Sequence, residues 1–167
     1  MNKLRVDSNE FEQIIRFKSL RFSKAGTITL IKDKYGSLLY SPQLRYKNYH
    51  NYTYLENIDE TTCFCKFKMD LPDCAGVYLW VVDNEIIYIG EAQNLRKRFN
   101  AGYGIISPRN CFKGGQSTNV RMNRVVLSCY QDGQTIDIYI CITEDYKNIE
   151  SYLLDNIKTK FNIQNNR

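Results

Sequence analysis

Residues 76–90 have the sequence GVYLWVVDNEIIYIG, which carries the strongest strand pattern in the chain. Two runs of β-branched and aromatic residues flank the polar turn Asp83-Asn84-Glu85, and this pattern predicts a β-hairpin. Tyr78 lies near the outer end of the first strand and Tyr88 near the outer end of the second. The segment is therefore either an ordinary packed hairpin or one wall of a site.

The length of the hairpin loop decides whether the two tyrosines share a face of the sheet. A two-residue loop pairs Val82 with Glu85 and sends the tyrosines to opposite faces, because side chains alternate along a strand. A three-residue loop pairs Tyr88 with Trp80 instead and places both tyrosines on one face. A site shared by Tyr78 and Tyr88 therefore requires an odd-length loop or a β-bulge.

The hydrophobic pattern beyond the hairpin predicts an α+β fold. The expected elements are strands 76–82 and 86–91, helices 94–100 and 118–130, strand 135–142 and helix 145–161. This β-β-α-α-β-α order gives a small three-stranded antiparallel sheet flanked by helices.

The N-terminal part is predicted to add a helix and strands to this core. Residues 7–20 have a capping-box spacing and an apolar stripe that predict a short amphipathic helix. Residues 26–41 alternate like two strands around a turn. Pro72 marks a boundary, which divides the chain into an N-terminal extension, 1–72, and a compact domain, 73–167.

The composition is that of a folded protein outside the membrane. Of the 167 residues, 43% are hydrophobic and 25% charged, near the averages for globular domains. No apolar run approaches the ~20 residues that span a bilayer, and the N-terminus lacks a signal-peptide core, so we expect a cytoplasmic protein.

The six cysteines lack paired C-x2-C spacing, which favours reduced thiols; zinc held by Cys63 and Cys65 with Cys74 or His50 is the alternative.

Two features favour a polyanionic partner. Residues 91–130 hold seven basic residues and one acidic residue, a net charge of +6, whereas residues 131–167 carry −2. Residues 40–54, YSPQLRYKNYHNYTY, interleave five tyrosines with basic residues. Such tyrosines either stack on nucleic-acid bases or pack on a small core, and the sequence leaves both readings open.

Glu150 falls on the apolar side of the last predicted helix. At ~100° per residue, it lies between positions such as Leu153 and Leu154 rather than on the polar side with Asp155. Burial of an unpaired carboxylate costs several kcal/mol. We therefore expect Glu150 to have a basic partner, to lie at the rim of a cleft, or to bind a hard cation such as Mg2+.

Together, these residues resemble the GIY-YIG nuclease superfamily. Gly76-Val77-Tyr78, nine intervening residues and Tyr88-Ile89-Gly90 resemble its defining motif. The text YIGEAQNLRKRF is similar to the segment that follows this motif in DNA-repair excision nucleases. Glu150 and Asn162, in ESYLLDNIKTKFN, resemble the metal-binding glutamate of the family and its companion asparagine. The likeness covers about residues 74–163.

The resemblance implies DNA phosphodiester hydrolysis with one Mg2+ or Mn2+ ion per active site. Tyr88 would activate the attacking water, and Tyr78 would support it by hydrogen bonding. Arg98 would stabilise the charge on the scissile phosphate, Glu150 would hold the metal, and Asn162 would orient the glutamate or the end of its helix.

The segment after Arg98 leaves alternatives for two roles. The family often has a histidine or tyrosine four residues after the arginine; here Tyr103 is the nearest candidate, one residue later. Residues 104–118 resemble an insertion found in restriction-type members of the family. In those members the catalytic arginine lies further along the sequence. Arg109 or Arg121 could therefore take the role of Arg98.

The resulting expectation is a sequence-specific, restriction-type endonuclease that acts on double-stranded DNA, as a monomer or a homodimer, with residues 1–72 contacting DNA or a second copy. The alternatives are a structure-specific repair or mobile-element nuclease, and a catalytically silent DNA-binding module. The expected DNA-contacting residues are Arg96, Lys97, Arg109, Lys113, Gln116, Asn119, Arg121 and Arg124.

Overall fold

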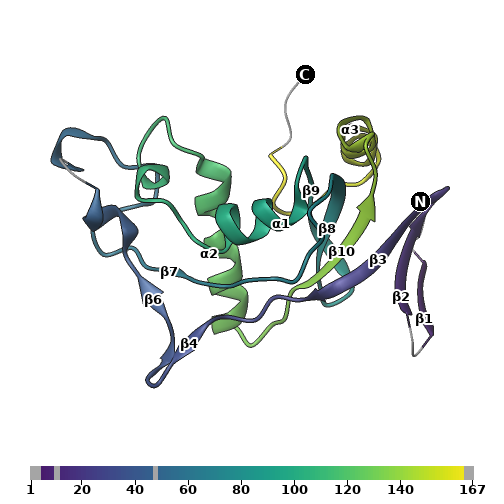
Figure 1. The fold of residues 1–167 in the computed structure, drawn as a ribbon, viewed down its shortest axis with the longest axis horizontal. Helices are drawn as coiled ribbons and strands as arrows, with labels where there is room; N and C mark the ends of the chain where they lie inside the picture. The colour runs from purple at the N-terminus through teal and green to yellow at the C-terminus, as the bar shows by residue number, and fades with distance from the viewer. Residues whose placement is uncertain (1–4, 10–11, 47–48, 164–167) are drawn as a thin grey trace. The chain divides into compact units, whose positions relative to one another are not determined.

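The computed structural model describes residues 5–9, 12–46 and 49–163, and it shows an α+β protein (Figure 1). The chain divides into two compact units. The first contains Met1–Thr27, Asp70–Arg96 and Gln134–Arg167, and the second contains Ile28–Met69 and Lys97–Gly133. Among the described residues, none of the helices has the length and apolar character required to cross a bilayer.

A six-stranded antiparallel sheet forms the first unit, with the strand order β1-β2-β3-β10-β8-β9 (Figure 1). The strands are β1 (Arg5–Asn9), β2 (Glu12–Phe17), β3 (Leu20–Thr27), β8 (Gly76–Val82), β9 (Glu85–Ala92) and β10 (Asp137–Ile142). The three predicted strands are present as β8, β9 and β10. The predicted sheet had three strands, but the observed sheet has six. Strand β3 pairs with β10, β2 pairs with β3, and β1 pairs with β2.

The predicted helix over residues 7–20 is wrong, since its described residues form β1, β2 and the start of β3. Ile15 and Phe17 are buried, and Arg16 between them is exposed, so the burial pattern has the two-residue period of a strand. Ile15 pairs with the buried Phe22 of β3. Packing on the large sheet therefore outweighed the capping signal; residues 10–11 of the predicted helix lie outside the described residues.

Helix α3 (Tyr146–Asn156) packs on one face of the sheet. Leu153 belongs to the same buried cluster as Val77, Leu79 and Ile89. The predicted helix 145–161 was too long at its C-terminal end. After Asn156 the chain becomes extended and runs to β9, where the backbone N–H of Phe161 donates to the carbonyl of Ile87 at 3.0 Å.

The second unit is built around helix α2 (Ser117–Gln131), which matches the predicted helix 118–130. Its core includes Phe64, Ile106, Phe112 and Val120. Two short strand pairs accompany it, β4 (Lys32–Asp33) with β5 (Gly36–Ser37) and β6 (Leu39–Tyr40) with β7 (Phe64–Cys65). The predicted helix 94–100 corresponds to α1 (Leu95–Lys97), followed by the π-helical segment Arg98–Tyr103.

The two compact units do not follow the predicted boundary at Pro72. Each unit contains segments from both sides of that residue. The division into an extension, 1–72, and a nuclease domain, 73–167, stays a prediction about which part of the chain carries which role.

Candidate active site

A β-bulge places the two hairpin tyrosines on the same face of the sheet. The loop has two residues, Asp83 and Asn84, both with positive φ angles (50° and 64°), as in the tight turns that suit a twisted hairpin. Val81 pairs with Ile86, but Trp80 pairs with Tyr88, so Ile87 is the extra residue of a bulge. A two-residue loop alone would send Tyr78 and Tyr88 to opposite faces. The bulge shifts the register by one residue and so places both on the same face.

The aromatic rings on this face are in contact and buried. The ring centroids of Tyr78 and Tyr88 are 6.4 Å apart, and the ring of Tyr88 meets that of Trp80 edge-on at 5.9 Å. Tyr78 and Trp80 are 0% exposed and Tyr88 is 6% exposed. Trp80 was not predicted as part of the site, although its position two residues after Tyr78 puts it on the same face.

Both glycines of the hairpin motif lie where a side chain has no room. A Cβ atom added at Gly90 would lie 2.5 Å from both Cζ and Oη of Tyr78, and one added at Gly76 would lie 2.7 Å from the carbonyl oxygen of Cys141. Gly90 therefore allows the ring of Tyr78 to cross β9. Part of the sequence motif is thus a packing requirement.

Glu150 is half-buried near the start of α3. The apolar side of α3 does face the sheet, but it packs on the face with Val77 and Leu79, opposite to the tyrosines. The helix begins at Tyr146, four residues after β10 ends beside Gly76, and this is the end of β8 at which Tyr78 lies.

Asn162 binds the edge strand of the sheet next to Tyr88. Its side-chain Oδ1 accepts from the backbone N–H of Ile89 at 2.8 Å, and its Nδ2 donates to the carbonyl of Ile89 at 2.7 Å. The Thr159 hydroxyl donates to the same Oδ1 at 2.6 Å. Asn162 therefore ties the segment after α3 to β9. Thr159, which supports Asn162, was not predicted as a site residue.

Arg98 and Tyr103, both predicted as site residues, lie together in the second unit. The guanidinium carbon of Arg98 is 4.5 Å from the ring centroid of Tyr103, and its Nη1 donates to Oδ1 of Asn119 at 3.0 Å. Asn119 in turn donates to Oε1 of Gln116 at 2.6 Å. Two amide side chains at the start of α2 thus hold the guanidinium of Arg98 against an aromatic ring.

The two alternative arginines have different surroundings. Arg109 lies in a loop, where its Nη1 donates to the carbonyl of Lys113 at 2.9 Å and its guanidinium lies 5.4 Å from the ring centroid of Tyr52. Arg121 is half-buried on α2. Arg109 and Arg98 both lie over an aromatic ring, but the guanidinium of Arg98 also donates to a side-chain amide, that of Asn119.

The predicted DNA-contacting residues fall into different environments. Asn119 is only 2% exposed and engaged with Arg98 and Gln116, an environment that does not favour its predicted role in reading bases. Arg96 belongs to the first unit, where its Nε donates to the carbonyl of Leu71 at 2.7 Å and lies 3.4 Å from the carboxylate of Asp73. Lys97, Lys113, Gln116 and Arg124 are exposed.

Metal-binding side chains do not cluster in the part of the chain that the structure describes. Within those ranges, no group of three or more His, Cys, Asp or Glu residues could hold a metal ion. Cys63 is exposed and Cys65 is buried, with its thiol 3.6 Å from Oδ1 of Asn123. The structure therefore gives no support to the zinc alternative.

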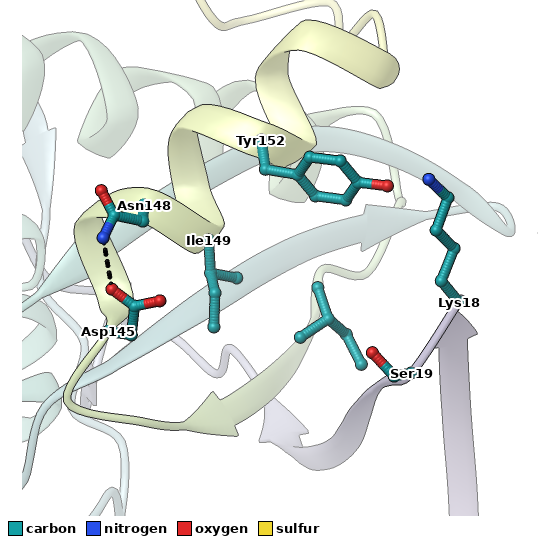
Figure 2. Close-up of a pocket in the computed structure, with 7 residues that line it drawn as sticks. Lys18, Ser19, Asp145, Asn148, Ile149 and Tyr152 are labelled. Atoms are coloured by element: carbon teal, nitrogen blue, oxygen red, sulfur yellow. Dashed lines mark hydrogen bonds between the residues drawn. The ribbon is translucent and has the colours of Figure 1, made fainter.

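A pocket of about 330 Å³ opens beside α3 in the first unit (Figure 2). It is lined by Lys18, Ser19, Leu20, Asp145, Asn148, Ile149 and Tyr152. The ammonium of Lys18 lies 4.9 Å from the ring centroid of Tyr152, and Asn148 donates to Asp145 at 2.5 Å. None of these lining residues was predicted as a site residue. Ile149, Tyr152 and Leu20 pack on the sheet face opposite to the tyrosines.

Comparison with known proteins finds limited similarity. The chain is 28% identical over 97 residues to UvrABC system protein C of Fusobacterium nucleatum subsp. nucleatum. The aligned part is 58% of this chain and 14% of that protein, so the chain spans about one seventh of its relative. No protein-family model and no solved structure matches the chain.

Proposed function

We propose that this chain is a metal-dependent DNA endonuclease of the GIY-YIG type. The observation that carries the proposal is the bulge at Ile87, because it brings Tyr78 and Tyr88 into contact on one face. The motif resemblance requires this arrangement, and a regular two-residue hairpin would prevent it. The similarity to UvrABC system protein C supports the nuclease superfamily loosely.

The tyrosine pair would handle the proton of the attacking water. A tyrosine has an ordinary pKa of about 10, so at neutral pH its hydroxyl is mostly protonated. Tyr88 must therefore lose its proton with the help of a nearby cation, or pass the water proton onward. Tyr78, in ring contact with it, would orient that hydroxyl, and their burial would keep bulk water away.

Glu150 would hold a single Mg2+ or Mn2+ ion. Mg2+ takes few ligands from a protein and keeps waters and phosphate oxygens, so one half-buried carboxylate fits this ion better than a closed multi-residue site would. When bound, the ion would polarise the phosphate and leaving-group oxygens. Asn162 would fix the segment after α3 on the strand that carries Tyr88.

Arg98 is our choice for stabilising the scissile phosphate. Its guanidinium is held by the amide oxygen of Asn119 and the ring of Tyr103, and a guanidinium is the side-chain group best suited to a bidentate contact with phosphate. Side chains fixed before the substrate arrives stabilise developing charge most effectively. The same support makes Tyr103 a positioning residue for Arg98.

Within the nuclease superfamily, we propose a sequence-specific, restriction-type enzyme acting on double-stranded DNA. The insertion-like segment 104–118 supports this subclass. Two cuts per site with one Glu150 per chain favour a homodimer. A structure-specific repair or mobile-element nuclease is the second candidate, favoured by the resemblance of YIGEAQNLRKRF to excision nucleases.

The test is cleavage of plasmid and genomic DNA by the purified chain with Mg2+ or Mn2+. Tyr88→Phe and Glu150→Gln should each lower the rate by about 100-fold or more. The matched controls are Tyr139→Phe, a buried tyrosine on the opposite face, and Asp155→Asn, an exposed carboxylate on the same helix; both should cut like wild type.

Three outcomes separate the candidates. Discrete genomic bands support the restriction-type enzyme, and cutting restricted to branched substrates supports the repair type. Binding of every tested DNA without metal-dependent cleavage would leave only the silent binding module.

A further inference from the structure

The charge of the chain is divided unevenly between the two compact units. The second unit holds twelve lysines and arginines against five aspartates and glutamates, a net charge of +7, whereas the first unit carries −2. A concentrated positive charge is the electrostatic signature of a polyanion-binding surface. The predicted catalytic tyrosines, Glu150 and Asn162 belong to the less basic unit.

Aromatic rings gather on this basic unit around Phe112. Tyr54 stacks on Phe112 with a centroid distance of 4.8 Å, and Tyr46 and Tyr52 contact the same ring at 5.4 and 5.9 Å. Phe112 is fully buried, but Tyr52 is 43% exposed. The cluster is therefore buried at Phe112 and exposed at Tyr52. Its buried part packs on the core, which is one of the two interpretations of the tyrosine-rich segment.

One cationic side chain, that of Arg109, lies against Tyr52, and a second, that of Lys113, belongs to a loop bonded to the Tyr52 segment. Arg109 lies over the ring of Tyr52, and backbone carbonyls of its own loop, including that of Lys113, hold its guanidinium. The backbone N–H of Lys113 donates to the carbonyl of Thr53 at 2.8 Å, which fixes the loop beside the Tyr52 segment, and the lysine side chain is exposed. Gly114 lets Arg109 approach, since an added Cβ there would lie 3.0 Å from its Nη2.

We propose that the second unit binds duplex DNA through this surface, which we name the Tyr52 surface and define by Tyr46, Tyr52, Arg109 and Lys113. Arg109 and Lys113 contact backbone phosphates, and the exposed edge of Tyr52 packs against a sugar or base edge. The inference rests on the proposed nuclease function, which supplies DNA as the polyanion. It assigns Arg109 to binding rather than to catalysis.

The experiment measures the affinity of the full chain for a fluorescein-labelled, mixed-sequence 40-base-pair duplex by fluorescence anisotropy, in a Glu150→Gln background that leaves the probe uncut. Lys113→Glu and Arg109→Glu should each weaken binding by about tenfold at low salt, and Tyr52→Ala by about fivefold. Lys113→Glu should also reduce the dependence of the affinity on salt concentration.

Lys34→Glu is the matched control. Lys34 belongs to the same unit, is exposed, and lies 4.8 Å from the ring centroid of Tyr35. It therefore has the same charge and a similar cation–aromatic contact but is not part of the Tyr52 surface. Its affinity should stay within about threefold of that of the background protein. Equal losses in Lys34→Glu and Lys113→Glu would overturn the proposal, as would unchanged binding in Lys113→Glu and Tyr52→Ala.

Failure of this inference is distinguishable from failure of the proposed function. Metal-dependent cleavage by the wild type, combined with unchanged binding in the surface variants, would refute the DNA-binding role of the Tyr52 surface but not the nuclease function. Binding that depends on Tyr52 and Lys113, without cleavage by the wild type, would refute the nuclease function but not the DNA-binding role of the Tyr52 surface.

Discussion

At the scale of single residues, a methyl group at position 90 would lie 2.5 Å from the ring of Tyr78, closer than any normal contact. Gly90→Ala should therefore displace Tyr78 or bend β9, and overpacking of this kind typically costs about 1–3 kcal/mol in the free energy of unfolding. Urea denaturation measures the loss. Gly102→Ala is the control, because its added Cβ would meet Asn119 at an ordinary 3.5 Å; equal losses in both variants would refute the steric explanation.

Asn119 gives a second prediction at this scale. Asn119→Ala removes the acceptor of Arg98, so the arginine should lose its fixed position and kcat should fall about tenfold or more, with KM nearly unchanged. Asn119→Asp keeps an acceptor for the guanidinium and should restore most of the rate. A loss of stability alone, without the split between kcat and KM and without rescue by aspartate, would show that Asn119 is only structural.

The sequence allows individual residues to be selected but not the side chains around them. Arg98 and Tyr103 were selected from the motif likeness, and the structure places them in contact. Asn119 was selected for its amide as a base reader, yet the amide is buried and occupied by Arg98. A single sequence gives residue types and spacing, but the partner of a side chain depends on tertiary packing.

At the scale of elements, predictions succeeded where one pattern dominated. The hairpin strands are runs of β-branched and aromatic residues beside a polar turn, α2 has an amphipathic helical pattern, and both predictions were confirmed. Residues 7–20 carried two competing signals, a helix capping box and the β-branched Ile14-Ile15, and pairing with β3 decided between them. The bulge at Ile87 was named only as one of two conditions for a shared face, because register depends on the whole sheet.

The link between Asn162 and β9 can be tested directly. Asn162→Ala removes both hydrogen bonds to the backbone of Ile89, so the Ile89 amide should exchange with solvent at least about tenfold faster. Hydrogen exchange followed by NMR measures this rate. Asn156→Ala removes a bond to the carbonyl of Tyr152 within α3 and should leave the exchange of Ile89 unchanged.

At the scale of the whole molecule, buried acids predict a loss of stability in alkaline solution. Burial raises the pKa of Cys65 to about 12, that of Cys111 to about 11 and that of Tyr40 to about 12. In the unfolded chain these groups ionise near their ordinary values of about 8.5 for thiols and 10 for tyrosine. Because the folded-state pKa values are higher, the stabilisation is complete below pH ~8.5 and is lost as the pH rises toward 11–12.

Denaturation series between pH 7 and 11 measure this decline in the free energy of unfolding. A Cys65→Ala/Cys111→Ala double variant has a cavity cost at every pH, but its decline between pH 8.5 and 10 should be shallower than that of the wild type. An equally steep decline in the double variant would contradict the assignment to these thiols.

The position of β10 has a consequence for how the protein is made. Among the described strands of the sheet, β10 (residues 137–142) is the last in sequence, but it lies between β3 and β8. On a ribosome, the meander β1–β3 and the hairpin β8–β9 emerge long before the strand that joins them, each with an unsatisfied edge. Folding of this sheet therefore waits until β10 has left the ribosome, and the nascent chain is exposed to aggregation in the interval.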